Sequence, residues 1–173
     1  MAGTINSLGI GSGVLTADLI DKLKNKLNFL NAKRFKKLIY KSSTADLSLE
    51  LPQNHLWIGG GLKSQDGTYF VPNMPTEEVF TMPHKDKTHG TVTATIPLSY
   101  RGSLIENFSL QFSEGKVTDF SAQKGEVALR KILETDPQAK FLGEVALVTH
   151  SSAISKLDLL FLNTLYDENA SNH

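Results

Sequence analysis

The chain has 173 residues, 40% hydrophobic and 21% charged, which is enough for one domain with a hydrophobic core. Eighteen Lys and Arg balance eighteen Asp and Glu, so the charge favours neither a nucleic acid nor a membrane as partner, because both attract a basic excess. The absence of cysteine excludes disulfides and thiolate chemistry, so a metal site has to use His, Asp and Glu. No apolar run reaches the ~20 residues of a membrane helix, and the N-terminus lacks a secretory pattern, so we expect a cytoplasmic protein.

Two helical segments are expected in the first part of the chain. Thr16 can cap the first of them. Apolar side chains then recur on one helical face, at Leu19, Ile20, Leu23, Leu27 and Leu30. The second is expected over residues 32–41, where clustered Lys and Arg are interpreted as a solvated face.

From residue 45 the pattern changes to short strands, expected over residues 46–51, 55–59, 68–71, 79–82, 90–98, 103–112 and 116–122. Turn signals at Arg101-Gly102 and Glu114-Gly115 separate the last three, which should form an antiparallel meander. A helix over residues 125–134 and a buried strand over residues 145–149 follow. This order predicts an α+β fold: a mixed, largely antiparallel sheet with flanking helices, preceded by the amphipathic helix.

Carboxylates adjoin several of the expected strands. Glu77 and Glu78 are neighbours, so only one of them can point at a given site on a strand. The local pattern alone favours a solvated strand edge for both. Glu144 stands at the mouth of a buried strand, where a carboxylate is costly unless it is paired, for example with a lysine.

The histidines give little guidance by themselves. His84, His89 and His150 fall in loops or just past a strand, and packing is the simpler role for His55. His173 is the last residue, and terminal side chains are usually frayed. Spacing alone therefore does not establish a metal site.

Several longer segments resemble the M29 (thermophilic) aminopeptidase family. Residues 73–81 read Asn-Met-Pro-Thr-Glu-Glu-Val-Phe-Thr, similar to that family's N-x-P-T-E-E-V-F-T signature. Residues 51–61, 90–92, 104–108, 143–148 and 164–170 fit the same family in the same order. The resemblance covers residues 28–173.

The resemblance implies a cytoplasmic enzyme that removes N-terminal residues from peptides, uses two divalent ions (zinc, cobalt, manganese or magnesium) and forms homodimers. The implied metal ligands are Glu78, Glu144, Glu168 and His173. Glu78 is preferred to Glu77 because its distance to Glu144 matches the family spacing without gaps. Glu144 resembles the carboxylate that bridges both ions and is the implied catalytic residue.

Two departures from the family pattern are apparent. The family continues beyond His173 with a further His, Asp and Tyr, so we expect a truncated catalytic domain with an incomplete centre. Residues 1–24, with Ser-Leu-Gly-Ile-Gly-Ser-Gly at positions 7–13, resemble the N-terminal segment of the flagellar filament cap protein (hook-associated protein 2). We therefore expect two parts, residues 1–27 and 28–173. Two alternatives to an aminopeptidase stay open: a non-catalytic dimerising or interaction module, and a flagellar structural fragment.

Overall fold

The computed structural model describes residues 17–150 and 152–173. In chain order the elements are α1 (Ala17–Lys33), β1 (Lys37–Lys41), β2 (Ala45–Glu50), β3 (Ile58–Gly59), β4 (Leu62–Lys63), β5 (Tyr69–Phe70), β6 (Glu78–Thr81), β7 (Thr88–Thr93), β8 (Leu98–Tyr100), β9 (Ser103–Ser113), β10 (Lys116–Lys124), α2 (Glu126–Leu133), β11 (Val145–Val148), the 3-10 helix η2 (Ser155–Leu157) and α3 (Thr164–Glu168). In these described ranges no helix has the length and hydrophobicity needed to cross a membrane.

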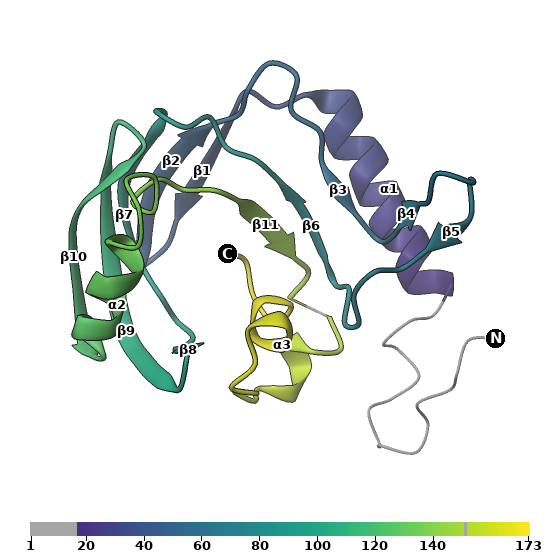
Figure 1. Ribbon diagram of the computed structural model, residues 1–173. Coiled ribbons are helices and arrows are strands. Elements are labelled where there is room, and N and C mark those ends of the chain that lie inside the picture. The colour runs from purple at the N-terminus through teal and green to yellow at the C-terminus, as the bar shows by residue number, and fades with distance from the viewer. Residues whose placement is uncertain (1–16, 151) are drawn as a thin grey trace.

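Six strands form the main sheet, in the order β1-β2-β7-β9-β10 with β8 paired to one end of β9 (Figure 1). Each of its recorded pairings is antiparallel. Both predicted turns are present. The central residues Arg101 and Gly102 have φ 47° and 78°, and Glu114 and Gly115 have φ 48° and 78°. Positive φ at both central residues is the pattern of a type I′ hairpin, so the predicted meander is confirmed.

A small sheet of three antiparallel strands, in the order β11-β6-β3, lies opposite the main sheet and is covered by α1 (Figure 1). Leu23 and Leu30 of α1 are 3% and 7% exposed and pack with Trp57, Val79 and Val145. The predicted amphipathic helix is therefore confirmed, and its apolar face covers the small sheet. A second core cluster, which includes Ile105, Phe112 and Leu129, fills the space between the main sheet and α2.

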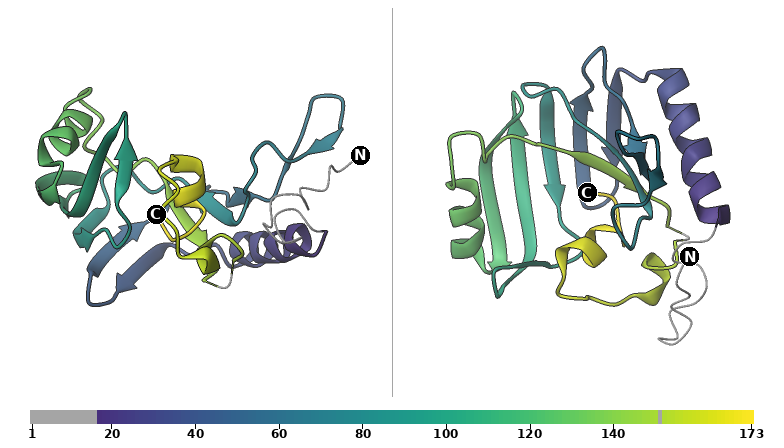
Figure 2. Two further views of the ribbon diagram at one scale, coloured as in Figure 1. Left: turned by 90° about the horizontal axis from the view of Figure 1, so that it is seen from below. Right: turned by 45° about the vertical axis from the view of Figure 1, so that its right-hand side comes forward.

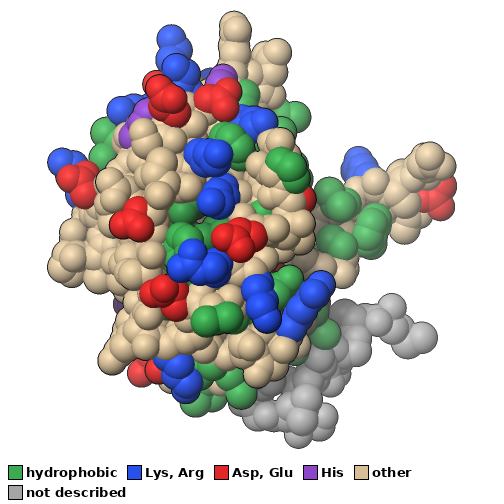
Figure 3. Space-filling view, turned by 60° about the vertical axis from the view of Figure 1, so that its left-hand side comes forward, with side chains coloured by type: hydrophobic (Ala, Val, Ile, Leu, Met, Phe, Trp, Pro, Cys, Tyr) green, Lys and Arg blue, Asp and Glu red, His purple; other side chains and the backbone are tan. Residues whose placement is uncertain are grey.

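The strands β4 and β5 form a separate hairpin, here called the arm, which projects from the body of the protein (Figures 2 and 3). Its base is held by the Tyr69 hydroxyl, which donates to the Gly60 carbonyl, and by the Lys24 ammonium, which lies 4.9 Å from the centre of the Tyr69 ring. Leu62 and Phe70 of the arm are exposed.

The predicted α+β class, with antiparallel sheets and flanking helices, is confirmed, but the second predicted helix is wrong. Within residues 32–41, α1 ends at Lys33 and Lys37–Lys41 forms β1. Leu38 and Tyr40 alternate with exposed neighbours and pack on the core, because β1 pairs with β2 along its whole length. The division into residues 1–27 and 28–173 stays a prediction, although α1 runs unbroken across that boundary.

Candidate metal centre

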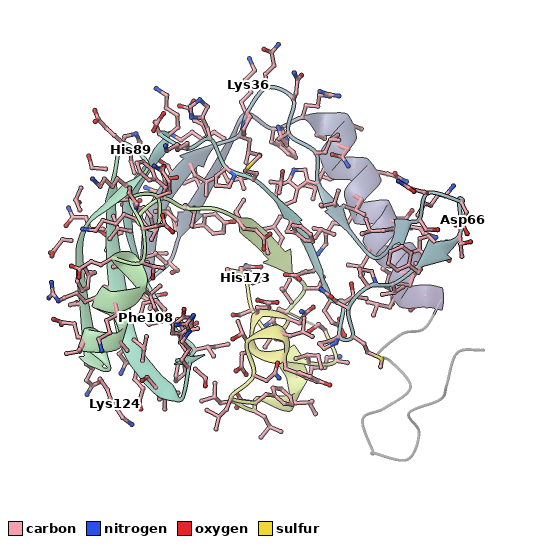
Figure 4. All side chains as sticks on the ribbon, viewed as in Figure 1. Lys36, Asp66, His89, Phe108, Lys124 and His173 are labelled. Atoms are coloured by element: carbon pink, nitrogen blue, oxygen red, sulfur yellow. The ribbon has the colours of Figure 1, made fainter. Side chains whose placement is uncertain are left out.

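Three side chains from separate parts of the chain meet beside the small sheet. Glu78, Glu144 and His173, here called the trio, each offer one ligand atom, and these atoms all lie within 4.8 Å of one another. The Nε2 atom of His173 is 3.2 Å from Oε2 of Glu78 and 3.7 Å from Oε1 of Glu144. In the view of Figure 4, His173 lies near the middle of the molecule, between the main sheet and the small sheet, whereas Lys36, Asp66 and His89 lie at the outline.

Strand pairing determines where the trio meets. Glu78 is the first residue of β6 and pairs with Val148, at one end of β11, while Glu144 precedes Val145 at the other end. The terminal segment lies along β11, because the Ala146 N–H donates to the His173 carbonyl at 2.6 Å and the Val148 N–H donates to Oδ1 of Asn172 at 2.8 Å. His173 therefore lies beside the middle of β11, and the two long carboxylate side chains reach it from either end.

The surroundings of the trio are graded from buried to exposed. The side chain of Glu78 is 10% exposed, that of His173 30% and that of Glu144 49%. Burial alone lowers the pKa of His173, but the carboxylate of Glu78, the carbonyl of Ser171 and the charge of Glu168 outweigh it and raise that pKa above its usual value. The site therefore favours a positive charge between its carboxylates.

Glu168 lies close to the trio but is not one of the three residues whose ligand atoms meet. The pKa of its carboxyl is raised, chiefly by burial. The negative charges of Glu78 and Glu144 also raise it, and the nearby His173 has the opposite effect. The structure thus brings together three of the four predicted ligands and places the fourth within electrostatic reach.

The interpretation of Glu77 and Glu78 as a solvated strand edge is wrong. The two residues are 3% and 7% exposed, because the segment that carries them is covered by β11 and by the chain around Asn169. Burial raises the pKa of Glu77, and the backbone of Ala153 opposes that shift. Glu144 has His173 rather than a lysine as its recorded partner, and the backbone of His173 is anchored rather than frayed.

The donor set fits a divalent cation. Carboxylate and imidazole groups are the ligands expected for zinc, cobalt or manganese in a site without cysteine. Oε2 of Glu78 is fully buried and, apart from its contact with His173, has no hydrogen-bond partner in the described part of the chain. A buried carboxylate oxygen is costly without a compensating charge, and a cation between Glu78, Glu144 and His173 would supply it.

A cavity of about 560 Å³ adjoins this site. Its lining includes Glu144, Glu168 and His173 together with apolar side chains of the main sheet, among them Leu47, Leu49, Val92, Leu110 and Phe112. This cavity is not predictable from local sequence patterns, because it forms between strands that are far apart in the chain.

Asn169 is a second feature that the sequence analysis did not predict. It is fully buried, and its side chain connects the end of α3 to the backbone of Glu77. The only local signal is its place directly after a helix, where Asn is common.

Comparison with known proteins agrees with this geometry. A family model described as thermophilic metalloprotease (M29) matches residues 17–173. Aminopeptidase AmpS of Bacillus subtilis (strain 168) is 49% identical over 151 residues, which are 87% of this chain and 37% of that protein. Aminopeptidase 2 of Geobacillus stearothermophilus is 50% identical over 153 residues, which are 88% of this chain and 37% of that protein. The chain thus spans less than two fifths of the length of these curated relatives.

Solved structures show the same similarity. Wild-type AmpT from Thermus thermophilus superimposes with a TM-score of 0.86 at 42% identity, covering 90% of this chain and 39% of that chain. A 2,5-dihydroxypyridine dioxygenase from Pseudomonas putida KT2440 has a TM-score of 0.62 at 15% identity, which shows a shared fold alone.

These comparisons do not support the resemblance of residues 1–24 to the flagellar cap protein. Residues 1–16 lie outside the described residues, and residues 17–24 belong to α1, which lies within the family match. On the extent of the family match and the identity to its relatives, the chain belongs to the M29 family of thermophilic metalloproteases.

Proposed function

We propose that this chain supplies the metal-binding part of an aminopeptidase, which hydrolyses the peptide bond after the first residue of a peptide. The observation that carries the proposal is the convergence of Glu78, Glu144 and His173 on one point. Glu168, beside them, is the fourth proposed ligand. The names of the relatives as aminopeptidases support the reaction class.

Glu78, Glu144, Glu168 and His173 would hold the divalent ions, which would supply Lewis acidity toward a peptide carbonyl and toward a water molecule. We propose two ions, drawn from zinc, cobalt, manganese and magnesium. The roles proposed for Glu78 and Glu144 follow from how exposed each side chain is. Glu78 is the buried, fixed ligand, whereas Glu144 is half exposed and faces the cavity, where peptide and water arrive. Glu144 is the proposed catalytic carboxylate and, by the family resemblance, the ligand that would be shared by both ions.

Hydrolysis of a leucine chromogenic substrate tests this proposal, with and without cobalt or zinc, in the wild type and in Glu144→Ala. Because the centre is expected to be incomplete in this chain, we expect weak metal-dependent turnover that falls at least ~100-fold further in the variant, since a lost ligand removes the stabilisation of developing charge. Glu134→Ala, at the exposed end of α2, is the matched control and should keep full activity. Unchanged turnover in Glu144→Ala would contradict the proposal. Folded protein that binds metal without turnover would instead favour a non-catalytic module.

Peptide substrates, a homodimer and a cytoplasmic location belong to the same proposal and rest on the family. The exposed Leu62 and Phe70 of the arm are compatible with contact between subunits. Light scattering coupled to size-exclusion chromatography tests the assembly: a mass of twice 19.0 kDa is expected, and a mass of 19.0 kDa at high protein concentration would contradict it.

A further inference from the structure

A buried amide side chain connects two segments that carry proposed metal ligands. Asn169 is 0% exposed and directly follows Glu168 at the end of α3. Its Oδ1 accepts a hydrogen bond from the Glu77 N–H at 2.7 Å, and its Nδ2 donates to the Leu165 carbonyl at 2.9 Å. From these contacts we infer that Asn169 is a positioning residue, which holds Glu78 and Glu168 in place for cation binding. This inference rests on the proposed metal centre.

Only a side chain that both accepts and donates can make these two bonds. The N–H of Glu77 is a donor and the carbonyl of Leu165 is an acceptor, and an amide side chain offers one group of each kind, on two atoms bonded to the same carbon. An apolar side chain of the same size leaves the buried N–H of Glu77 and the part-buried carbonyl of Leu165 without this partner, which destabilises the contact. Because α3 has five residues, its last carbonyls also depend on partners outside the helix.

The same contacts fix the ligands on either side of Asn169. Glu78 follows Glu77 in the chain and pairs with Val148 of β11. The backbone on the N-terminal side of Glu78 is therefore held by the hydrogen bond to Asn169, and Glu78 itself is held by strand pairing in the small sheet. Glu168 is the neighbour of Asn169 in the chain. At the other end of the terminal segment, His173 is held by Ala146. The hydrogen bond between Asn169 and Glu77 thus links the two segments and limits the distance between Glu78 and Glu168.

Hydrogen-bonded groups behind metal ligands typically contribute 10- to 100-fold to metal affinity, because they keep the ligands oriented before the ion arrives. We therefore expect loss of Asn169 to weaken metal binding by at least ~10-fold, although its own side-chain atoms are engaged with Glu77 and Leu165.

Asn31 provides a matched control. Its Oδ1 accepts from the Trp57 N–H at 2.9 Å and its Nδ2 donates to the Trp57 carbonyl at 3.0 Å, so it makes the same pair of bonds between α1 and the segment before β3. Asn31 does not belong to the trio and does not line the cavity beside it. Asn31→Leu should therefore lower stability as Asn169→Leu does, without the effect on metal binding.

The experiment compares the wild type, Asn169→Leu, Asn169→Ser and Asn31→Leu. Calorimetric titration with Co²⁺ and Zn²⁺ measures affinity, the visible absorption of bound Co²⁺ reports ligand geometry, and urea unfolding without metal measures stability. We expect both Asn169 variants to bind Co²⁺ at least ~10-fold more weakly, with a changed absorption spectrum. We expect Asn31→Leu to bind within about two-fold of the wild type, since it leaves the ligands and their supports intact.

Wild-type affinity and spectrum in folded Asn169 variants would overturn the inference, as would equal weakening in Asn31→Leu. If Asn169→Leu does not fold, the smaller serine substitution decides by the same criteria. A wild-type protein that binds neither ion would overturn the metal centre itself, which is a different result from binding that is insensitive to Asn169.

Discussion

The hydroxyl of Tyr40 is buried at the wall of the cavity and has no hydrogen-bond partner among residues 17–150 and 152–173. Burial raises the pKa of Tyr40 to about 12, because the phenolate is excluded from water. In the unfolded chain the same group ionises near pH 10. Between these values the unfolded state has released the proton and the folded state has kept it, so stability falls as the pH rises.

Tyr40→Phe should therefore be as stable as the wild type at pH 8, or up to ~1 kcal/mol more stable, since it removes a buried hydroxyl without a partner. It should also lose less stability between pH 10 and pH 12. Urea unfolding of both proteins at pH 8, 10.5 and 11.5 checks this. A parallel loss in the two proteins would show that Tyr40 does not cause the alkaline decline.

The burial of Glu77 and Glu78 could not be predicted from the residues around them in the sequence. The pattern around Glu77 and Glu78 is equally compatible with a solvated edge, and their burial depends on β11 and Asn169, which lie at least 60 residues away in the chain. The family resemblance predicted Glu78, Glu144, Glu168 and His173 as ligands because it carries this long-range information. The structure brings three of them together, and their role as ligands stays a prediction.

Two hairpin turns of the main sheet share one backbone geometry but differ in their surroundings. Gly102 and Gly115 both have φ 78°. A Cβ at Gly102 meets nothing within 4 Å, whereas a Cβ at Gly115 would lie 1.7 Å from the Lys85 carbonyl oxygen. The two positions therefore separate the effect of backbone strain from that of a steric clash.

Gly102→Ala should lower the free energy of unfolding by about 1 kcal/mol, the usual effect of a side chain in the left-handed region. Gly115→Ala should lower it by roughly 3 kcal/mol or more, because the loop at Lys85 must also move. Thermal and urea unfolding of both variants measure the difference. Equal losses at the two positions would contradict the close packing of Lys85 on the turn.

The helix α1 tests whether the N-terminal part of the described chain is integral to the fold. Leu23 is 3% exposed in the core, while Phe29 on the same helix is 54% exposed. Leu23→Ala should lower the free energy of unfolding by roughly 2–5 kcal/mol, and Phe29→Ala by less than about 1 kcal/mol. Urea unfolding of both variants checks this. A small effect at Leu23 would mean that α1 does not belong to the core.

Most elements with strong alternation or clear turns were predictable, and β1 shows why others were not. A helix was predicted over residues 32–41, with its clustered Lys and Arg as a solvated face, but Leu38 and Tyr40 have the alternation of a strand. That alternation becomes decisive only when β2 is available as a partner, with Lys41 opposite Asp46. Pairing between segments thus overrode the local propensity.

At the scale of the whole molecule, the site lies where the two sheets come together. The main sheet supplies apolar residues of the cavity lining, the small sheet carries Glu78, and the terminal segment carries Glu168 and His173. Positive and negative side chains are interspersed on the outer face (Figure 3), in keeping with the formal net charge of zero. The site differs from that face, because the carboxyl groups of Glu78, Glu144 and Glu168 lie around the single imidazole of His173.

Because Glu78, Glu144 and His173 come from three segments, metal binding should stabilise the whole fold. A free ion concentration of 100 times the dissociation constant should raise the free energy of unfolding by about 2.7 kcal/mol. A chelator should reverse this gain. Thermal unfolding with Zn²⁺, and then with excess chelator, measures it. An unfolding temperature that is indifferent to both additions would contradict coupling between the ion and the fold.

The central claim is that Glu78, Glu144 and His173 form a divalent-cation site, and calorimetric titration of the full chain with Co²⁺ tests it most directly. We expect saturable binding in the wild type and in the exposed control Glu134→Gln, and at least ~10-fold weaker binding in Glu78→Gln and Glu144→Gln. Absence of binding to the folded wild type, or equal affinity in all four proteins, would contradict it.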